Sequence, residues 1–215
     1  MKRQYTIGLV GNPNCGKTTL FNALTGSKQR VGNWPGVTVT RKSGEFRSGE
    51  QQVEVVDLPG TYSLDVVDRE ISLDEMVARD YVHAGEAALI VNVVDAANLE
   101  RNLYLTTQLA EMGLPLLVVL NMGDVAEAKG MRVDADALAG QLGCPVVPVI
   151  ASQGKGIPDL KAAIIQAAAA QPRAKARPTY AMEVEAAVGE LANRMPDVHH
   201  ISPRWLSARL LEGTS

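Results

Sequence analysis

The chain has 215 residues, enough for one α/β domain with a smaller second unit, and its 46% hydrophobic but only 4% aromatic content predicts an aliphatic core. A formal net charge of −3 argues against a broad nucleic-acid-binding surface, and two cysteines offer no disulfide framework, which fits a reducing compartment. We recognise no signal peptide and no apolar run near the roughly 18 residues of a membrane-spanning helix, so we expect this polypeptide to be soluble.

The first stretch of interest joins a predicted strand, Tyr5 to Val10, to a predicted helix that begins near Thr19. Between them lies the phosphate-binding spacing G-x-x-x-x-G-K-T. Its residues are Gly11, Asn12, Pro13, Asn14, Cys15, Gly16, Lys17 and Thr18. Backbone N–H groups in such a loop surround an anion, and the helix N-terminus adds partial positive charge. We expect Lys17 to bridge the β- and γ-phosphates and the Thr18 hydroxyl to hold Mg²⁺.

Strand-like and helix-like segments alternate along the rest of the first 170 residues. Further strands are expected at 37–46 and 52–56, joined by a turn at 48–49, and at 87–94, 115–121 and 145–150. Helices are expected at 74–84, from a cap at Asn98 to Gly113, at 134–142 and at 157–170. This alternation predicts an α/β fold with a mostly parallel six-stranded sheet and helices on both faces. Ligands in such folds bind beyond the carboxyl ends of the strands.

A boundary is expected near residues 171–178. Beyond it, Val184, Val188, Leu191 and Met195 recur at helical spacing, and Ser202-Pro203 predicts the start of a second helix. Two helices cannot bury a core alone, so we expect them to dock on the main domain or on residues beyond this chain. The sequence therefore suggests a fragment of a longer protein.

Two further motifs occur in the order that a GTP-hydrolysing switch needs. Asp57-Leu58-Pro59-Gly60 ends a predicted strand, so Asp57 is placed to hold Mg²⁺ through water and the Gly60 N–H to contact a γ-phosphate. Upstream, Gly36-Val37-Thr38 predicts a mobile loop whose Thr38 hydroxyl completes the Mg²⁺ shell. Asp-x-x-Gly alone is a weak signal and is usually a plain turn, but its distance from the phosphate loop favours a function here.

Asn121-Met122-Gly123-Asp124 follows a buried strand and predicts guanine recognition. A carboxylate accepts hydrogen bonds from N1–H and the exocyclic amine of guanine, whereas adenine presents an acceptor at N1 and would leave that carboxylate unpaired. Met122 replaces the lysine of the usual N-K-x-D pattern, so selectivity for guanine is expected to soften. Ala151-Ser152-Gln153 would present backbone N–H groups to the guanine O6, a weak motif that counts only by its position.

Three stretches make a resemblance specific. Residues 29–39, 57–63 and 92–105 resemble FeoB, the prokaryotic ferrous iron transporter family, in its cytoplasmic N-terminal region. The resemblance runs from about Ile7 to Leu160, and the last two predicted helices resemble the start of the family's helical, GDI-like domain. It implies a Ras-like P-loop NTPase G domain over residues 1–170 and part of the helical domain over residues 171–215.

The resemblance implies a slow GTPase that binds Mg²⁺-GTP and controls Fe²⁺ import. Its place would be the cytoplasmic face of the bacterial inner membrane, with the family's transmembrane domain and small Feo accessory proteins as partners, no nucleic acid, and a homo-oligomer left open. Asn14 resembles the asparagine of K⁺-activated GTPases, in which carbonyls such as those of Gly32 and Trp34 also bind K⁺. Thr61 stands where Ras-type enzymes have glutamine, so hydrolysis would depend on cations and on Asn14, Lys17, Thr38 and Gly60.

Other readings stay open at this point. One is a nucleotide-dependent binding module with negligible turnover, and another is a ribosome- or tRNA-associated GTPase, which the acidic balance opposes. A P-loop kinase would have no use for the Asn121–Asp124 motif. Glu100 and Arg101 are expected on a helix surface or at an interdomain contact, without a role toward the nucleotide.

Overall fold

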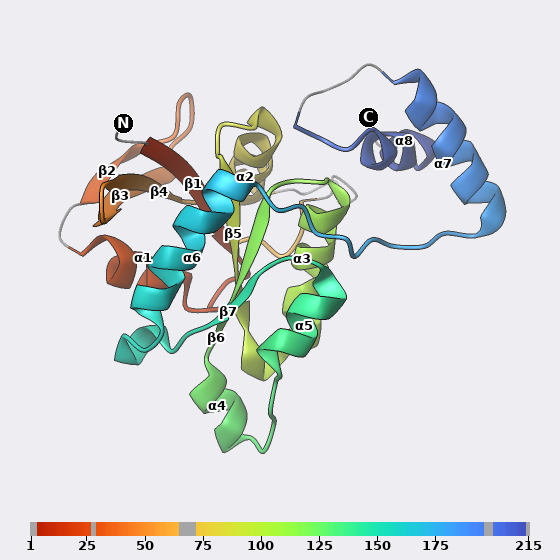
Figure 1. Cartoon of the computed structure of the whole chain (residues 1–215). Coiled ribbons are helices and arrows are strands. Elements are labelled where there is room, and N and C mark those ends of the chain that lie inside the picture. Colours follow the sequence, from red (N-terminus) through yellow and green to blue (C-terminus); the bar gives the residue numbers. More distant parts are fainter. Residues whose placement is uncertain (1–3, 27–28, 65–71, 196–199, 214–215) are drawn as a thin grey trace.

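The computed structural model describes residues 4–26, 29–64, 72–195 and 200–213. Within these ranges seven strands form one sheet in the order β2-β3-β4-β1-β5-β6-β7 (Figure 1). The strands are β1 (Gln4–Gly11), β2 (Gln29–Asn33), β3 (Thr40–Ser48), β4 (Gln51–Asp57), β5 (Leu89–Asp95), β6 (Leu116–Asn121) and β7 (Val146–Pro148). Adjacent strands in the row β4-β1-β5-β6-β7 are parallel to each other, whereas β3 is antiparallel to both β2 and β4.

Helices cover both faces of the sheet. The α-helices are α1 (Lys17–Thr25), α2 (Leu73–Ala84), α3 (Leu99–Glu111), α4 (Gly123–Ala128), α5 (Ala135–Leu142), α6 (Ile157–Ala170), α7 (Met182–Arg194) and α8 (Pro203–Leu211). Two short 3₁₀ helices are η1 (Ala96–Asn98) and η2 (Ala151–Gln153). Apolar residues of α1 and α6 pack on one face of the sheet, and those of α2, α3 and α5 pack on the other (Figure 1). Because β5 and β6 lie between these layers, all their residues are buried.

The α/β class and the mostly parallel sheet are confirmed, but the expectation of six strands is wrong. The seventh strand is β2, which pairs along the sheet edge with β3. All five residues of β2 are exposed. A strand with no buried face needs no alternation of apolar and polar residues, so the sequence signal that marks a half-buried strand is absent here. Strand β3 also begins at Thr40 rather than Val37, because the Val37 N–H closes a turn onto the Trp34 carbonyl.

Two local expectations also need correction. Asn98 holds the N-cap position of α3, but its side chain does not cap that helix; instead its Nδ2 donates to Asp95 Oδ2 at 2.6 Å. The short helix α4 was not anticipated, because six residues carry too little helical periodicity. Met122 stands at its N-cap with φ 63, a left-handed conformation that non-glycine residues rarely adopt.

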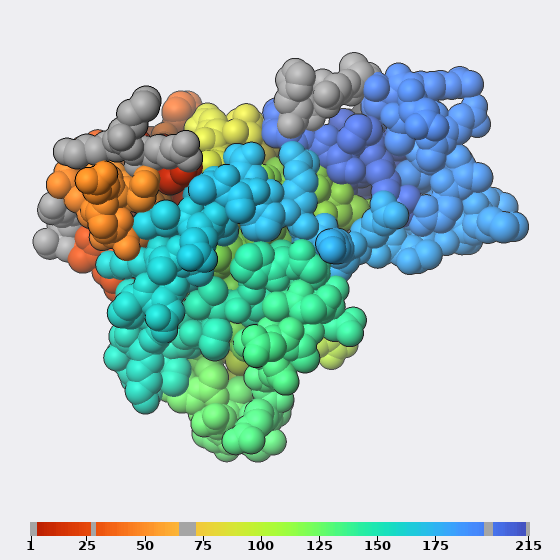
Figure 2. Space-filling view, viewed as in Figure 1, coloured from red at the N-terminus to blue at the C-terminus, as the bar shows by residue number. Residues whose placement is uncertain are grey.

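The last two helices dock on the main domain, which is the first of the two arrangements expected from the sequence. In Figures 1 and 2 they form the blue unit at one side of the molecule. The Ser202 N–H donates to the Met112 carbonyl at 2.7 Å, and the Tyr180 hydroxyl donates to Glu111 Oε1 at 2.6 Å. Within the predicted apolar row of α7, Val188 is fully buried whereas Val184 is 41% exposed, so this helix is only partly covered.

Helix α6 ends at Ala170, at the predicted boundary. None of the helices in the described ranges combines the length and hydropathy that a membrane-spanning helix requires.

Candidate nucleotide-binding site

The predicted phosphate loop connects β1 to α1 at the carboxyl edge of the sheet. It forms one wall of a cleft of about 590 Å³. Among the described residues, the cleft is lined by Asn12, Pro13, Asn14, Gly16, Lys17, Thr18, Thr19, Gly60, Asp74 and Met122. Nine of these were expected from the sequence. Asp74, in the first turn of α2, was missed because the residues around it form no nucleotide-binding motif.

The two motif glycines are required by packing inside the protein. A Cβ atom on Gly11 would lie 2.6 Å from the Val93 carbonyl oxygen, and one on Gly16 would lie 2.3 Å from Asn121 Nδ2. Gly16 also has φ 86, and Asn14 has φ 66, which asparagine tolerates better than most residues. The spacing of the motif therefore follows from the loop's fit against β5 and β6 as well as from the approach of a phosphate.

Cys15 contributes its backbone to the loop while its side chain is buried. Burial raises the pKa of the Cys15 thiol to about 11, so the sulfur remains protonated at neutral pH. A thiol in this state is a weak nucleophile, which fits a packing role.

Lys17, which lines the cleft, forms a buried ion pair with Asp57. Lys17 Nζ lies 2.6 Å from Asp57 Oδ1, and both side chains are about nine-tenths buried. Thr18 lies next to Lys17 at the start of α1 and lines the same cleft. The Thr18 hydroxyl and the Asp57 carboxylate are oxygen ligands of the kind that Mg²⁺ prefers, so this donor set fits the ion.

The segment after β4 passes close to the phosphate loop. The Leu58 N–H donates to the Leu9 carbonyl at 3.0 Å, and the Thr61 N–H donates to the Gly11 carbonyl at 3.2 Å. Between them, a Cβ atom on Gly60 would lie 3.3 Å from Pro13 Cα. The structure thus places Gly60 at the cleft, while the Leu58 side chain is buried in the core.

The other proposed switch segment lies apart from the cleft. Gly32 belongs to β2, and Gly36, Val37 and Thr38 lie in the following turn, with Thr38 exposed. Within the described chain, none of these residues lines the cleft.

Trp34 lies in the loop after β2, yet it is only 8% exposed. Its ring meets Tyr81 of α2 edge-to-face at 5.5 Å, and the Arg41 guanidinium lies 4.8 Å from its centroid. This burial anchors the turn against α2.

The guanine motif is tied to the phosphate loop through one side chain. Asn121 Nδ2 donates to the Cys15 carbonyl at 3.0 Å, and Asn121 Oδ1 accepts from the Ala151 N–H at 3.1 Å. Asp124 Oδ2 accepts from Gln153 Nε2 at 3.0 Å. The two segments predicted to recognise the base therefore lie together, with polar groups paired to one another, and Asn121 joins them to the phosphate loop. Ser152, between Ala151 and Gln153, is exposed.

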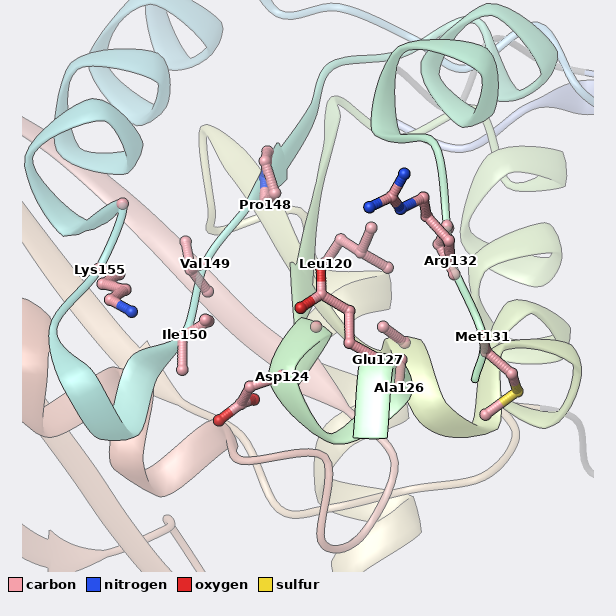
Figure 3. A pocket seen from close by; sticks show the side chains of 14 residues that line it. Leu120, Asp124, Ala126, Glu127, Met131, Arg132, Pro148, Val149, Ile150 and Lys155 are labelled. Carbon is pink, nitrogen blue, oxygen red and sulfur yellow. The ribbon is translucent and has the colours of Figure 1, made fainter. Parts of the chain in front are cut away.

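A second cavity of about 300 Å³ lies beside the base motif, between α4 and residues 148–156. Figure 3 shows Asp124 at its edge, with Glu127, Arg132 and Lys155 around an apolar floor that includes Leu120. Its lining contains no residue of the phosphate loop among those described.

One further residue makes contacts at the site that the sequence did not indicate. Arg101 is exposed on α3, as expected, but its backbone carbonyl accepts a hydrogen bond from Asn12 Nδ2 at 3.3 Å. Its guanidinium lies 4.2 Å from the centroid of the Tyr62 ring. Arg101 thus touches both the phosphate loop and the segment after Gly60, which no local pattern could indicate.

Comparison with known proteins agrees with this geometry. The family model described as ferrous iron transport protein B matches residues 5–164. The Fe(2+) transporter FeoB of Escherichia coli (strain K12) is 52% identical over 217 residues, and that of Salmonella typhi is 52% identical over 212 residues. Each alignment covers 98% of this chain but 27% of the relative, so the chain spans about a quarter of the length of these transporters.

Solved structures give the same result. The cytosolic domain of L. pneumophila FeoB superposes with a TM-score of 0.86 at 43% identity, covering 97% of this chain and 88% of that chain. The cytosolic domain of T. maritima FeoB in GDP form I has a TM-score of 0.89 at 38% identity, covering 100% of this chain and 82% of that chain. The chain therefore belongs to the ferrous iron transport protein B (FeoB) family and matches the N-terminal G domain of its members.

Proposed function

We propose that this chain binds Mg²⁺-GTP and hydrolyses it slowly, as the cytoplasmic switch domain of a bacterial inner-membrane transporter that imports Fe²⁺. The observation that carries the proposal is the side chain of Asn121, which ties the guanine motif to the phosphate loop beside Lys17 and Thr18. A relative solved in a GDP form supports the choice of a guanine nucleotide. The partners would be the transmembrane domain of the family, small accessory proteins and further copies of the chain in a homo-oligomer.

The residues around the cleft have distinct tasks. Lys17 and the loop N–H groups bind the phosphates, and the Gly60 N–H contacts the γ-phosphate. Thr18, Asp57 and Thr38 hold Mg²⁺, which neutralises charge on the phosphate oxygens when bound. For Thr38 to do so, the turn after β2 must move toward the cleft, because Thr38 lies outside it in this structure.

K⁺ stimulation is part of the same proposal. Asn14 lines the cleft, which suits a cation next to the phosphates. The Gly32 and Trp34 carbonyls would join it after the turn moves, since the Trp34 carbonyl now accepts the Val37 N–H at 3.3 Å. A cation fixed at this point would stabilise the charge that develops on the transferred phosphoryl group.

Base recognition depends on Asp124, with the Ala151 and Ser152 N–H groups facing the guanine O6. Asp124 would exchange its hydrogen bond from Gln153 for hydrogen bonds from the base. The Ala151 N–H would likewise exchange its bond to Asn121 for one to the base. Met122 covers the ring by packing in place of lysine, so the preference for GTP over ATP is softer than in N-K-x-D proteins.

The test combines nucleotide competition with salt exchange. GTP should displace fluorescent GDP more effectively than ATP does, and GTP hydrolysis should rise when K⁺ replaces Na⁺. Asn14→Ala should remove the K⁺ dependence while leaving GDP affinity nearly unchanged. Thr107→Ala, on α3, is the control variant and should keep both properties of the unchanged chain. Failure to bind guanine nucleotide in Mg²⁺ buffer would overturn the proposal, and equal rates in the two salts would remove its K⁺ part.

A second candidate is a binding module whose nucleotide state sets contacts of the helical unit. It is favoured by the docking of that unit on the two helices that flank the segment after Gly60, through Tyr180 with Glu111 and through His200 with the His83 carbonyl. Transport by the full-length relative when hydrolysis is blocked but binding is retained would separate the two.

A further inference from the structure

Helix α3 presents two side chains to the segment that follows Gly60. Arg101 and Gln108 are seven residues apart in the helix, which places them on one face two turns from each other. Arg101 contacts Tyr62, and Gln108 contacts Ser63 and Leu64. One rigid element thus holds three consecutive residues of a segment that has no regular secondary structure.

The Gln108 contact uses both ends of the side-chain amide. Gln108 Oε1 accepts from the Leu64 N–H at 3.0 Å, and Gln108 Nε2 donates to Ser63 Oγ at 2.9 Å. The side chain is only 6% exposed, so water competes weakly for these bonds. A glutamate could accept at this position but could not donate, so the pair of bonds is specific to an amide.

The Arg101 contact joins the same segment to the phosphate loop. Its guanidinium lies over the Tyr62 ring at 4.2 Å, while its carbonyl accepts from Asn12 Nδ2. Tyr62 is 38% exposed, so this cation–π contact is the weaker of the two, on the order of 0.5–1 kcal/mol at a surface. The contact matters because it orients the Tyr62 ring, which it holds against the first turn of α3.

Gly60 is held between these contacts and the loop. The Thr61 N–H donates to the Gly11 carbonyl, and the Thr61 hydroxyl donates to the Ser63 carbonyl at 2.5 Å. Thr61 is fully buried. Each residue from Thr61 to Leu64 therefore has a contact outside the segment: Thr61 and Leu64 through the backbone N–H, and Tyr62 and Ser63 through the side chain.

We propose that Arg101 and Gln108 are positioning residues for GTP hydrolysis, which hold residues 61–64 so that the Gly60 N–H faces the γ-phosphate. The inference rests on the proposed function. Its physical basis is that Thr61 offers no side-chain amide to orient the attacking water, so catalysis depends on the placement of backbone groups. A displacement of about 1 Å in such a group costs on the order of 100-fold in rate.

The proposal predicts a split between two measurements. GDP has no γ-phosphate, so loss of the α3 contacts should leave GDP affinity within about twofold. The kcat for GTP should fall about fivefold in Gln108→Leu, the equivalent of about 1 kcal/mol for one net hydrogen bond. Gln108→Glu, which retains the acceptor, should fall less, and Arg101→Leu should fall about threefold, consistent with a weaker contact.

Rescue variants separate positioning from general stability. Arg101→Lys keeps a cation over the ring and Tyr62→Phe keeps the ring, so both should retain most of the kcat, whereas Tyr62→Ala should match Arg101→Leu. Thr107→Ala changes the neighbour of Gln108 on α3 and serves as the control. The assay is single-turnover GTP hydrolysis and fluorescent-GDP titration on the 215-residue chain, with thermal unfolding recorded for each variant.

The possible outcomes are distinct. Unchanged kcat in Gln108→Leu and Arg101→Leu would overturn the proposal, as would a parallel fall in GDP affinity, which would mean a structural role. Should Gln108→Leu fail to fold, the Arg101→Leu and Arg101→Lys pair decides between the same two results. Absence of GTP binding by the wild-type chain is recognised separately, because it would overturn the proposed function itself.

Discussion

Lys17 Nζ lies 2.6 Å from Asp57 Oδ1, so the side chain expected to bind phosphate and the one expected to hold Mg²⁺ neutralise each other directly. Under the proposed function, binding of Mg²⁺-nucleotide would open this buried ion pair and exchange it for pairs with the ligand. In this structure the two opposite charges compensate each other, which limits the cost of burying either one.

The first prediction concerns this pair. Lys17→Ala should weaken GDP and GTP binding about 10- to 100-fold, since a charge-assisted hydrogen bond is worth about 1.5–3 kcal/mol. Asp57→Asn should weaken binding in Mg²⁺ but have little effect in EDTA, because the amide still accepts from Lys17 while its hold on the ion is lost. Fluorescent-GDP titrations in the two buffers check this, and an equal loss in both would contradict the assignment of Asp57 to the metal.

The second prediction compares the glycine at the N-cap of α1 with the glycine that begins α4. Gly16→Ala should lower the free energy of unfolding by about 1–3 kcal/mol, because φ 86 and a Cβ 2.3 Å from Asn121 Nδ2 both oppose a side chain. It should also weaken nucleotide binding by breaking the bond from Asn121 to Cys15. Gly123→Ala is the matched control, since its Cβ would meet no described atom within 4 Å and alanine favours the helix. Urea unfolding measures both, and equal effects would show that the Asn121 contact is unimportant.

The third prediction concerns the base. Asp124→Ala should remove the preference for GTP over ATP in a competition series. Gln153→Ala should raise guanine affinity by up to about fivefold, because the carboxylate is then released from a hydrogen bond worth about 1 kcal/mol. Met122→Lys, which restores the usual pattern, should sharpen the preference. An Asp124→Ala variant with unaltered base preference would place guanine recognition elsewhere.

The fourth prediction is a pH dependence of stability at the joint with the helical unit. His83 packs edge-to-face on Trp205 at 5.3 Å, and burial, with a contribution from the Arg79 charge, lowers the pKa of its imidazole. Asp80 on its own helix opposes the shift, and His200 of the helical unit adds to it.

The sign follows from linkage. Unfolded His83 takes up a proton near its ordinary pKa of about 6.5, whereas folded His83 does so only at lower pH. Its neutral form thus favours folding above pH 6.5, and stability falls as the pH drops from there toward the folded pKa. His83→Phe keeps a ring against Trp205 and should show a smaller loss between pH 7.5 and 5.5 in urea unfolding. An identical pH dependence in both proteins would exclude His83 as its source.

Several parts of the site were predictable because their signals are local. The phosphate loop, Asp57 to Gly60 and Asn121 to Asp124 each combine a short spacing with a strand end, and parallel strands end at one edge of the sheet. Their convergence therefore followed from the α/β alternation alone. The helix at 157–170 was likewise predicted in full, because its apolar residues recur with clear periodicity.

The fold class, the family and most of the residues that line the cleft follow from the sequence alone, since these depend on spacing and backbone conformation within a few residues. Only the tertiary structure decided that β2 joins the sheet, that Trp34 is buried against Tyr81, and that Asn121 bonds to Cys15, 106 residues earlier. It also decided that Arg101 and Gln108 contact the segment after Gly60. The physical reason is that hydrogen bonds and ring contacts between distant segments depend on how the layers pack, and a hydrophobic pattern specifies which face is buried without specifying which partner it meets.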